Sequence, residues 1–341
     1  MRELIRRIRA ASRRRTAGWG DGDDDATART DGGETRELPR TAVGPRIRSL
    51  RDSEFVRSLP FWLLPGLYMG LFVYGAIGWN VVISLTDWSG FGTPSYANLD
   101  LSTYSRMLSD PNFWTATRNT VVLLLVFTGL SLVVGLVLAI LIDRGVRFEN
   151  TFRTIYLLPM SLSFVVTAIF WAWMYNFEIG LVNELLRAAG LNFLTQQWIS
   201  DPRFKLLAVI FALMWQFSGY CMVVYLAGLR AIPTDLYEAA KVDGASTARM
   251  YWRVILPQLR ASTTSAAVVL MVFALKAFDF LFVLFGTNPG PSADILAMMM
   301  FRQAFTVTNW AYGAAIATIL FVLALGVISP YLYLQYKRGE L

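Results

Sequence analysis

The chain alternates long apolar runs with short polar segments, and this alternation predicts its architecture. A helix needs roughly 20 apolar residues to cross a bilayer. Six runs reach that length, at residues 60–86, 120–142, 154–176, 206–228, 261–286 and 311–334. They are continuously apolar and almost free of ionisable residues, so we expect helices rather than the strands of a barrel. The sequence therefore predicts an all-α integral membrane protein with six transmembrane helices.

A polar segment, residues 229–260, separates the fourth run from the fifth and carries its own helix signals. Thr234 is a candidate N-cap for a first short helix. Gly244 is expected to end that helix, because glycine accepts the left-handed geometry of a helix C-terminus. Ser246 or Thr247 is a candidate cap for a second helix. The segment is therefore predicted to be a helix–turn–helix lying parallel to the membrane.

These residues leave two interpretations of the helix pair open. Ala239 and Ala240 are small enough to permit close approach of another backbone, and Glu238 places a charge beside them. Such a face suits docking onto a cytoplasmic partner. In the alternative, the pair is a plain amphipathic element at the membrane interface, with Tyr251 and Trp252 among the lipid headgroups.

Composition and charge agree with a membrane protein and orient it. The chain is 55% hydrophobic and 16% charged, which is too apolar for an ordinary soluble domain. Most of the 31 Lys and Arg residues lie in residues 1–59, in the 143–153 and 229–260 loops and at the C-terminus. Because positive residues stay on the cytoplasmic side, both termini are predicted to be cytoplasmic in a multi-pass protein of the cell membrane. The net charge of +7 fits this topology without a nucleic-acid partner.

The N-terminal region differs from the rest of the chain. Residues 1–50 begin with a basic stretch and continue with an acidic, glycine-rich one. Neither stretch can bury a core, so we expect a disordered cytoplasmic tail. Residues 51–341 are predicted to form one transmembrane domain. In its second outer loop, the letters LVNELLRAAG predict a short surface helix.

The residue types exclude several kinds of chemistry. The chain has no histidine and one cysteine, Cys221, so a zinc or haem site and a Ser–His or Cys–His nucleophile are not expected. It also lacks a G-x-x-x-x-G-K-[ST] phosphate-binding loop. If ATP drives the protein, a partner must hydrolyse it. We therefore predict that this chain is not an enzyme and binds no cofactor or metal itself.

Two ionisable residues, Lys276 and Asp279, lie inside the fifth run. A charge near the bilayer centre costs roughly 2.5–3.5 kcal/mol even on lenient scales. Because the two residues are three positions apart, they are expected to share a helix face and to be able to pair. In the structural interpretation they form an ion pair or snorkel to an interface. In the functional interpretation they form a polar wall of a transport pathway.

The fourth run contains Gln216 and Tyr220, about one helical turn apart. Hydrogen-bonding groups beside an aromatic face are typical of sugar sites. Ordinary packing between helices is the competing explanation, above all for the aromatic residue. Gln216 is the better candidate, because an amide in lipid needs a partner.

A longer pattern spans the polar segment. The letters E-A-A at 238–240, glycine at 244 and V-I-L-P at 254–257 resemble the EAA signature of permease subunits of binding-protein-dependent ABC importers, with valine where the family has isoleucine. The stretches IPTDLYEAAKVDGAS and LKAFDFLFVLFGTNPGPS resemble the sugar-permease branch, although Asn288 stands where family members often have glycine. The likeness covers about residues 60–341.

The resemblance implies a role for the polar segment and a set of partners. In that family the segment forms a coupling helix seated in a cleft of a cytoplasmic ATPase, which assigns Glu238, Ala239, Ala240 and Gly244 to docking. The implied complex contains a second permease, two copies of the ATPase with their ATP and Mg²⁺, and an extracytoplasmic substrate-binding protein.

The resemblance also implies that the spans flanking this segment line the substrate cavity. It adds Phe273 to Gln216 and Tyr220, and Lys276 and Asp279 complete the predicted pathway set. The expected function is import of a sugar by alternating access. Import of another small polar solute remains an alternative. A secondary transporter or channel is disfavoured because no inverted repeat or repeated pore segment is found, and a membrane-embedded enzyme because no convergent acid–base set exists.

Overall fold

The computed structural model describes residues 54–97 and 99–338, which contain helices and no strand. The all-α prediction is therefore confirmed for these residues. The chain divides into two units, Met1–Trp62 and Leu63–Leu341. The predicted tail, residues 1–50, lies outside the described residues, and only the start of one helix is described in the first unit. The features below belong to the second unit.

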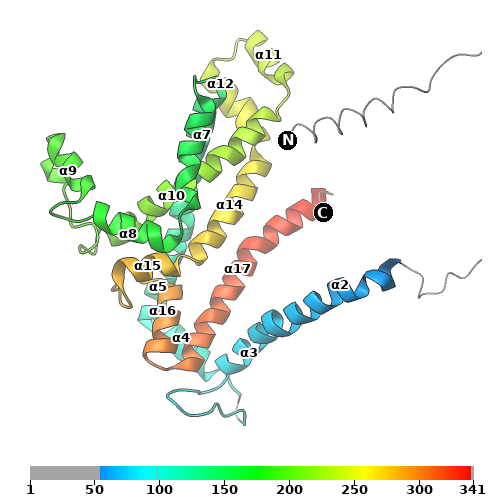
Figure 1. Cartoon of the computed structure of the whole chain (residues 1–341), viewed down its shortest axis with the longest axis vertical. Helices are drawn as coiled ribbons and strands as arrows, with labels where there is room; N and C mark the ends of the chain where they lie inside the picture. The colour runs from blue at the N-terminus through cyan, green and yellow to red at the C-terminus, as the bar shows by residue number, and fades with distance from the viewer. Residues whose placement is uncertain (1–53, 98, 339–341) are drawn as a thin grey trace, which may run out of the picture. The chain divides into compact units, whose positions relative to one another are not determined.

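Figure 1 shows the helices of the chain. In chain order they are α2 (Glu54–Met69), η2 (Gly70–Tyr74), α3 (Gly75–Ser84), α4 (Ser102–Ser109), α5 (Pro111–Val122), η3 (Leu123–Phe127), α6 (Thr128–Asp143), α7 (Glu149–Leu157), η4 (Leu158–Ser161), α8 (Phe164–Met174), α9 (Leu181–Ala188), η5 (Asn192–Leu194), α10 (Lys205–Arg230), α11 (Thr234–Val242), α12 (Thr247–Met250), η6 (Tyr251–Ile255), α13 (Leu256–Gln258), α14 (Arg260–Leu275), α15 (Phe278–Phe285), α16 (Leu296–Phe301), η7 (Arg302–Thr306) and α17 (Trp310–Arg338).

The helices that can cross a membrane agree in part with the predicted six spans. Within the described residues, four continuous helices are long and apolar enough: Ser58–Ser84, Pro111–Asp143, Lys205–Arg230 and Trp310–Lys337. Two further stretches qualify as pairs bent by 102° and 68°, so the number reaches six if each bent pair counts as one span. The 102° bend falls at residues 162–163, inside the third predicted span, and the 68° bend falls at Leu259, just before the fifth.

The third predicted span, residues 154–176, is not one continuous helix. Pro159 lies in the short η4 turn, and Leu162 and Ser163 then adopt extended backbone angles. The Ser163 hydroxyl accepts a hydrogen bond from the backbone N–H of Val166 at 3.3 Å and so caps α8. As a result, α8 crosses the end of α7 instead of continuing it (Figure 1).

The fifth predicted span, residues 261–286, is also interrupted. Helix α14 ends at Leu275, a two-residue turn follows, and α15 begins at Phe278. Gly286 has a φ of 73° and ends α15. The prediction of a single helix over residues 261–286 is therefore wrong. The turn was missed because the apolar composition of this run gives no sign of it.

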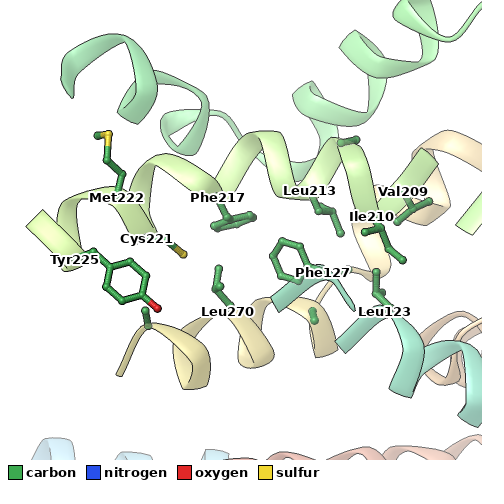
Figure 2. Packing of buried hydrophobic residues seen from close by; sticks show 14 of the residues in the cluster. Leu123, Phe127, Val209, Ile210, Leu213, Phe217, Cys221, Met222, Tyr225 and Leu270 are labelled. Atoms are coloured by element: carbon green, nitrogen blue, oxygen red, sulfur yellow. The ribbon is translucent and has the colours of Figure 1, made fainter. Parts of the chain in front are cut away.

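Helix α10 lies at the centre of the buried core. Figure 2 shows its side chains Leu213, Phe217 and Cys221 pointing towards Phe127 of η3 and Leu270 of α14. The neighbouring helices approach α10 closely through glycines, as is common where membrane helices pack by contact rather than by hydrophobic exclusion. A Cβ added at Gly135 of α6 would lie 2.3 Å from the Cβ of Cys221.

Candidate functional site

Helix α11 forms where the polar segment was predicted to begin its first helix. It covers Thr234–Val242, with Pro233 at the N-cap position and Asp235 in the first turn. Thr234 is the first helical residue and its side chain makes no capping hydrogen bond, so the prediction that it is the N-cap is wrong. The Pro233 carbonyl instead accepts from the backbone N–H of Leu236 at 3.2 Å.

The turn after α11 has the predicted geometry. Gly244 has a φ of 71°, the left-handed conformation that glycine adopts without a Cβ clash. The N–H of Ala245 donates to the Ala240 carbonyl and the N–H of Gly244 to that of Lys241, each at 3.0 Å. This pair of bonds is a Schellman motif. Ser246 then caps α12 by accepting from the backbone N–H of Arg249 at 3.4 Å.

The residues of α11 face in different directions. Glu238 and Ala239 are exposed, whereas Ala240 is 6% exposed and belongs to the buried core. Val242, one turn after Ala239, is 87% exposed. Glu238, Ala239 and Val242 therefore form an exposed surface, called here the outer face of α11. Val242 was not among the predicted docking residues, although an apolar residue beside the glycine stop was a visible signal.

The 143–153 loop braces this helix pair. The Arg144 guanidinium lies 5.8 Å from the centre of the Tyr251 ring, within the range of a cation–π contact. Burial and the nearby Asp143 carboxylate, together with Tyr251, raise the pKa of Tyr237 in α11. The base of α6 therefore lies against both α11 and η6.

An ionic cluster joins α7 to the end of α10 beside this brace. One carboxylate oxygen of Glu149 accepts from the guanidinium of Arg230 at 2.6 Å and from that of Arg153 at 3.1 Å. The Glu149 side chain is 27% exposed. Because one acid holds two cations from different helices, the N-terminal end of α7 and the C-terminal end of α10 are tied together.

The predicted pairing of Lys276 with Asp279 is wrong. The two residues do not lie on one helix face, since Lys276 is the C-cap of α14 and Asp279 stands in the first turn of α15. Both are exposed, and neither forms an ion pair within the described part of the chain. Asp279 at a helix N-terminus and Lys276 at a helix C-terminus each meet a favourable helix dipole.

Gln216 is 2% exposed and has a structural partner. Its Nε2 donates to the Leu162 carbonyl at 2.8 Å, which is one of the backbone groups freed by the break before α8. Its Oε1 is buried without a hydrogen-bond partner. Gln216 therefore holds the bend of the third span and retains one unused acceptor.

The remaining pathway candidates lie at different distances from that bend. Phe273 packs against Phe217 and Phe164, with ring centres 4.6 and 6.2 Å apart, so it lies near the bend beside Gln216. Tyr220 is half-buried, one turn further along α10. Lys276 follows Phe273 by one turn, and the two cavities described below, both within residues 99–338, are lined by none of the five predicted residues.

A cavity of about 460 Å³, lined by apolar and by hydroxyl- and amide-bearing side chains, lies between α10, α14 and α17. Its lining includes Gly228, Ser262, Ser265, Tyr331 and Gln335. The Gln335 amide donates to the Tyr331 hydroxyl at 2.6 Å. The sequence analysis missed this cavity, although the Ser-Thr-Thr-Ser run at 262–265 inside an apolar stretch was a signal for it.

Metal chemistry has no support in the described residues. No three His, Cys, Asp or Glu residues within 54–97 and 99–338 lie together in a way that would hold a metal ion.

Comparisons with known proteins agree on one family. Residues 131–338 match the family described as binding-protein-dependent transport system inner membrane component. The chain is 55% identical over 303 residues to the xylose/arabinose import permease protein of Haloferax volcanii, covering 88% of this chain and 95% of the relative. It is 52% identical over 292 residues to a probable ABC transporter permease of Pyrococcus horikoshii, covering 85% and 100%.

A solved structure shows the same fold. The bacterial ABC transporter that imports the acidic polysaccharide alginate contains a chain with a TM-score of 0.66 and 23% identity, covering 83% of this chain and 97% of that one. Together with the family match, this confirms the resemblance carried by the 238–257 signature. The chain belongs to the inner-membrane components of binding-protein-dependent transport systems, the permease subunits of ABC importers, and is a transport component rather than an enzyme.

Proposed function

We propose that this permease imports a neutral monosaccharide of the pentose class, handed over by an external binding protein. The observation that carries the proposal is the 55% identity, over 88% of the chain, to a xylose/arabinose import permease. The absence of a phosphate-binding loop from the sequence assigns ATP and Mg²⁺ to the partner ATPases.

The outer face of α11 is the proposed docking surface for one ATPase. Ala239 and Val242 offer an apolar surface without long side chains, and Glu238 adds one charge at its edge. Ala240 supports this surface from inside, because it is buried in the core of the chain. Gly244 sets the angle between α11 and α12 through its left-handed backbone.

The bracing contacts support a mechanical role. A force on α11 reaches α6 through Tyr237 and Tyr251, which lie beside Asp143 and Arg144. The Glu149 cluster passes it on to α7 and α10. Alternating access is then a shift between two packed arrangements of these helices, driven by closure of the ATPases.

The proposed pathway runs along α10 and α14. Gln216, Tyr220 and Phe273 lie near the bend, and Lys276 and Asp279 provide exposed charges at the turn after α14. The cavity between α10, α14 and α17 has serine and glutamine side chains in its lining. It extends the proposed pathway towards the C-terminal end of α10 and the N-terminal end of α14, which adjoin the 229–260 segment. Because unfilled polar groups are costly in hydrocarbon, the cavity suits water and a polar solute.

The proposed complex contains a second permease, two copies of an ABC ATPase and an extracytoplasmic binding protein. The chain lies in the cell membrane with the α11 side and both termini in the cytoplasm. The basic residues around α11, among them Arg230, Lys241, Arg249 and Arg253, support this orientation.

Uptake by the reconstituted complex tests the proposal. Proteoliposomes containing the complex and its binding protein are supplied with radiolabelled D-xylose, L-arabinose, maltose or glycine betaine. We expect ATP-dependent uptake of a pentose in preference to the other solutes. Uptake of glycine betaine alone, or of no sugar by a complex that hydrolyses ATP normally, would refute the sugar assignment.

A further inference from the structure

A second cavity, of about 330 Å³, lies at the opposite end of the membrane-crossing helices from α11. Its lining includes Asp110 and Asn112 at the start of α5, whereas the base of α6 lies beside Tyr251. Helices α5, η3 and α6 form one continuous span, Pro111–Asp143, so its two ends lie on opposite sides of the membrane. With α11 in the cytoplasm, this cavity opens to the outside.

The floor of the outer cavity is rigid. Arg302 donates two hydrogen bonds to the Asp294 carboxylate, and their side chains are only 20% and 10% exposed. The buried Asn119 amide donates to the carbonyl oxygens of Pro291 and Asp294, both at 2.8 Å. Side chains from α5 therefore hold the 286–295 loop in place. Such a loop is preorganised for a ligand.

The mouth of the cavity carries amide groups with unused hydrogen-bonding capacity. The Gln303 amide has no partner within the described residues, and the Asn288 amide nitrogen has none there either. Asn112 uses its nitrogen to donate to Asp110 at 3.1 Å, which leaves its carbonyl oxygen free. The lining therefore offers both free donors and free acceptors, together with the remaining N–H groups of Arg302.

This arrangement suits a hydroxylated ligand without negative charge. Asp294 neutralises Arg302, whereas Asp110, which accepts from the Tyr312 hydroxyl at 2.9 Å, keeps its negative charge and can accept a further hydrogen bond from a sugar hydroxyl. Each amide can donate to one sugar hydroxyl and accept from its neighbour. Ligand pockets span roughly 300–1,000 Å³, so a cavity of about 330 Å³ is large enough to hold a monosaccharide.

We propose that the outer cavity is a reception subsite that holds one monosaccharide when it leaves the binding protein and before it enters the spans. Gln303 and Asn288 bind its hydroxyls, and the Arg302–Asp294 pair forms the floor. The proposal rests on the sugar-import function proposed above. It adds a site outside the pathway set on α10 and α14.

The double variant Gln303→Ala/Asn288→Ala tests the subsite. The matched control is Gln197→Ala, which removes an exposed amide from another outer loop. The complexes are reconstituted with the binding protein, and D-xylose or L-arabinose uptake is measured per ATP hydrolysed. We expect uptake per ATP to fall about five-fold in the double variant, as loss of several sugar hydrogen bonds predicts, and to be unchanged in the control. Stimulation of ATP hydrolysis by the loaded binding protein stays at the wild-type level.

Three outcomes would overturn the subsite, and they are distinguishable. Wild-type uptake per ATP in the double variant would show that no sugar binds there. Loss of stimulation by the loaded binding protein would show that the cavity docks that protein instead. Failure of the unaltered complex to take up any sugar would refute the proposed function itself, and the subsite with it.

Discussion

At the scale of single residues, Gly219 sets how closely α10 approaches the end of α7. A Cβ at this position would lie 1.8 Å from the Tyr156 carbonyl oxygen, a backbone atom that cannot rotate away. We expect Gly219→Ala to force the helices apart at a cost of roughly 1–3 kcal/mol or more. Gly129→Ala in α6, where nothing lies within 4 Å, is the control. Thermal unfolding in detergent compares the two, and equal stability would contradict the close approach.

Gln216 gives a second prediction at this scale. Gln216→Ala removes the donor to the Leu162 carbonyl, and a buried unpaired carbonyl costs roughly 1–3 kcal/mol. We expect both the melting temperature and sugar uptake to fall, because the same amide holds the bend and lies in the proposed pathway. Ser218→Ala, also in the buried part of α10, is the control. Reduced uptake with an unchanged melting temperature would mean that Gln216 serves the solute alone.

Gln216 also shows what the sequence can and cannot predict about a single residue. An amide inside an apolar run must find a partner, so Gln216 was identifiable from its type. Its partner was not, because the Leu162 carbonyl becomes free only when the third span breaks. The predicted pairing of Lys276 with Asp279 was wrong for a related reason. Their spacing implies a shared helix face only if the helix continues, and α14 ends at Leu275, before both of them.

At the scale of elements, the α11–α12 pair is defined by local sequence signals that agree: Gly244 ends α11 and Ser246 caps α12. Gly244 has a φ of 71°, and this left-handed backbone costs an ordinary residue roughly 1–2 kcal/mol, so a valine side chain in its place would be strained. We expect Gly244→Val, and Glu238→Lys on the outer face, to abolish uptake while the permease still inserts. Gly244→Asn is the control, since asparagine tolerates this backbone. Co-purification of the ATPase and uptake are measured together, and normal uptake in both variants would remove the docking role.

The elements that sequence reasoning found share one property: their signals are local. Both α11, which ends at the Gly244 turn, and α9 appeared where the sequence placed them, although the predicted N-cap of α11 was wrong. The breaks before α8 and after α14 depend instead on contacts between distant residues and on a turn without glycine or proline. The outer cavity escaped detection for the same reason, because α5 lies far along the chain from the 286–295 loop and η7.

At the scale of the whole molecule, alternating access requires the cavity between α10, α14 and α17 to change its exposure to water. The native Cys221 is fully buried, so a cysteine introduced at Ser262 in that cavity is the reactive one. We expect Ser262→Cys in the assembled complex to react with a membrane-impermeant maleimide from the cytoplasmic side without nucleotide. Labelling should fall about three-fold or more once ATP and Mg²⁺ are bound to ATPases that cannot hydrolyse it, because the favoured arrangement then changes. Val146→Cys, in the exposed 143–153 loop, should label equally in both states. Equal labelling of Ser262→Cys in the two states would mean that the cavity stays outside the moving pathway and belongs to an interface with the second permease.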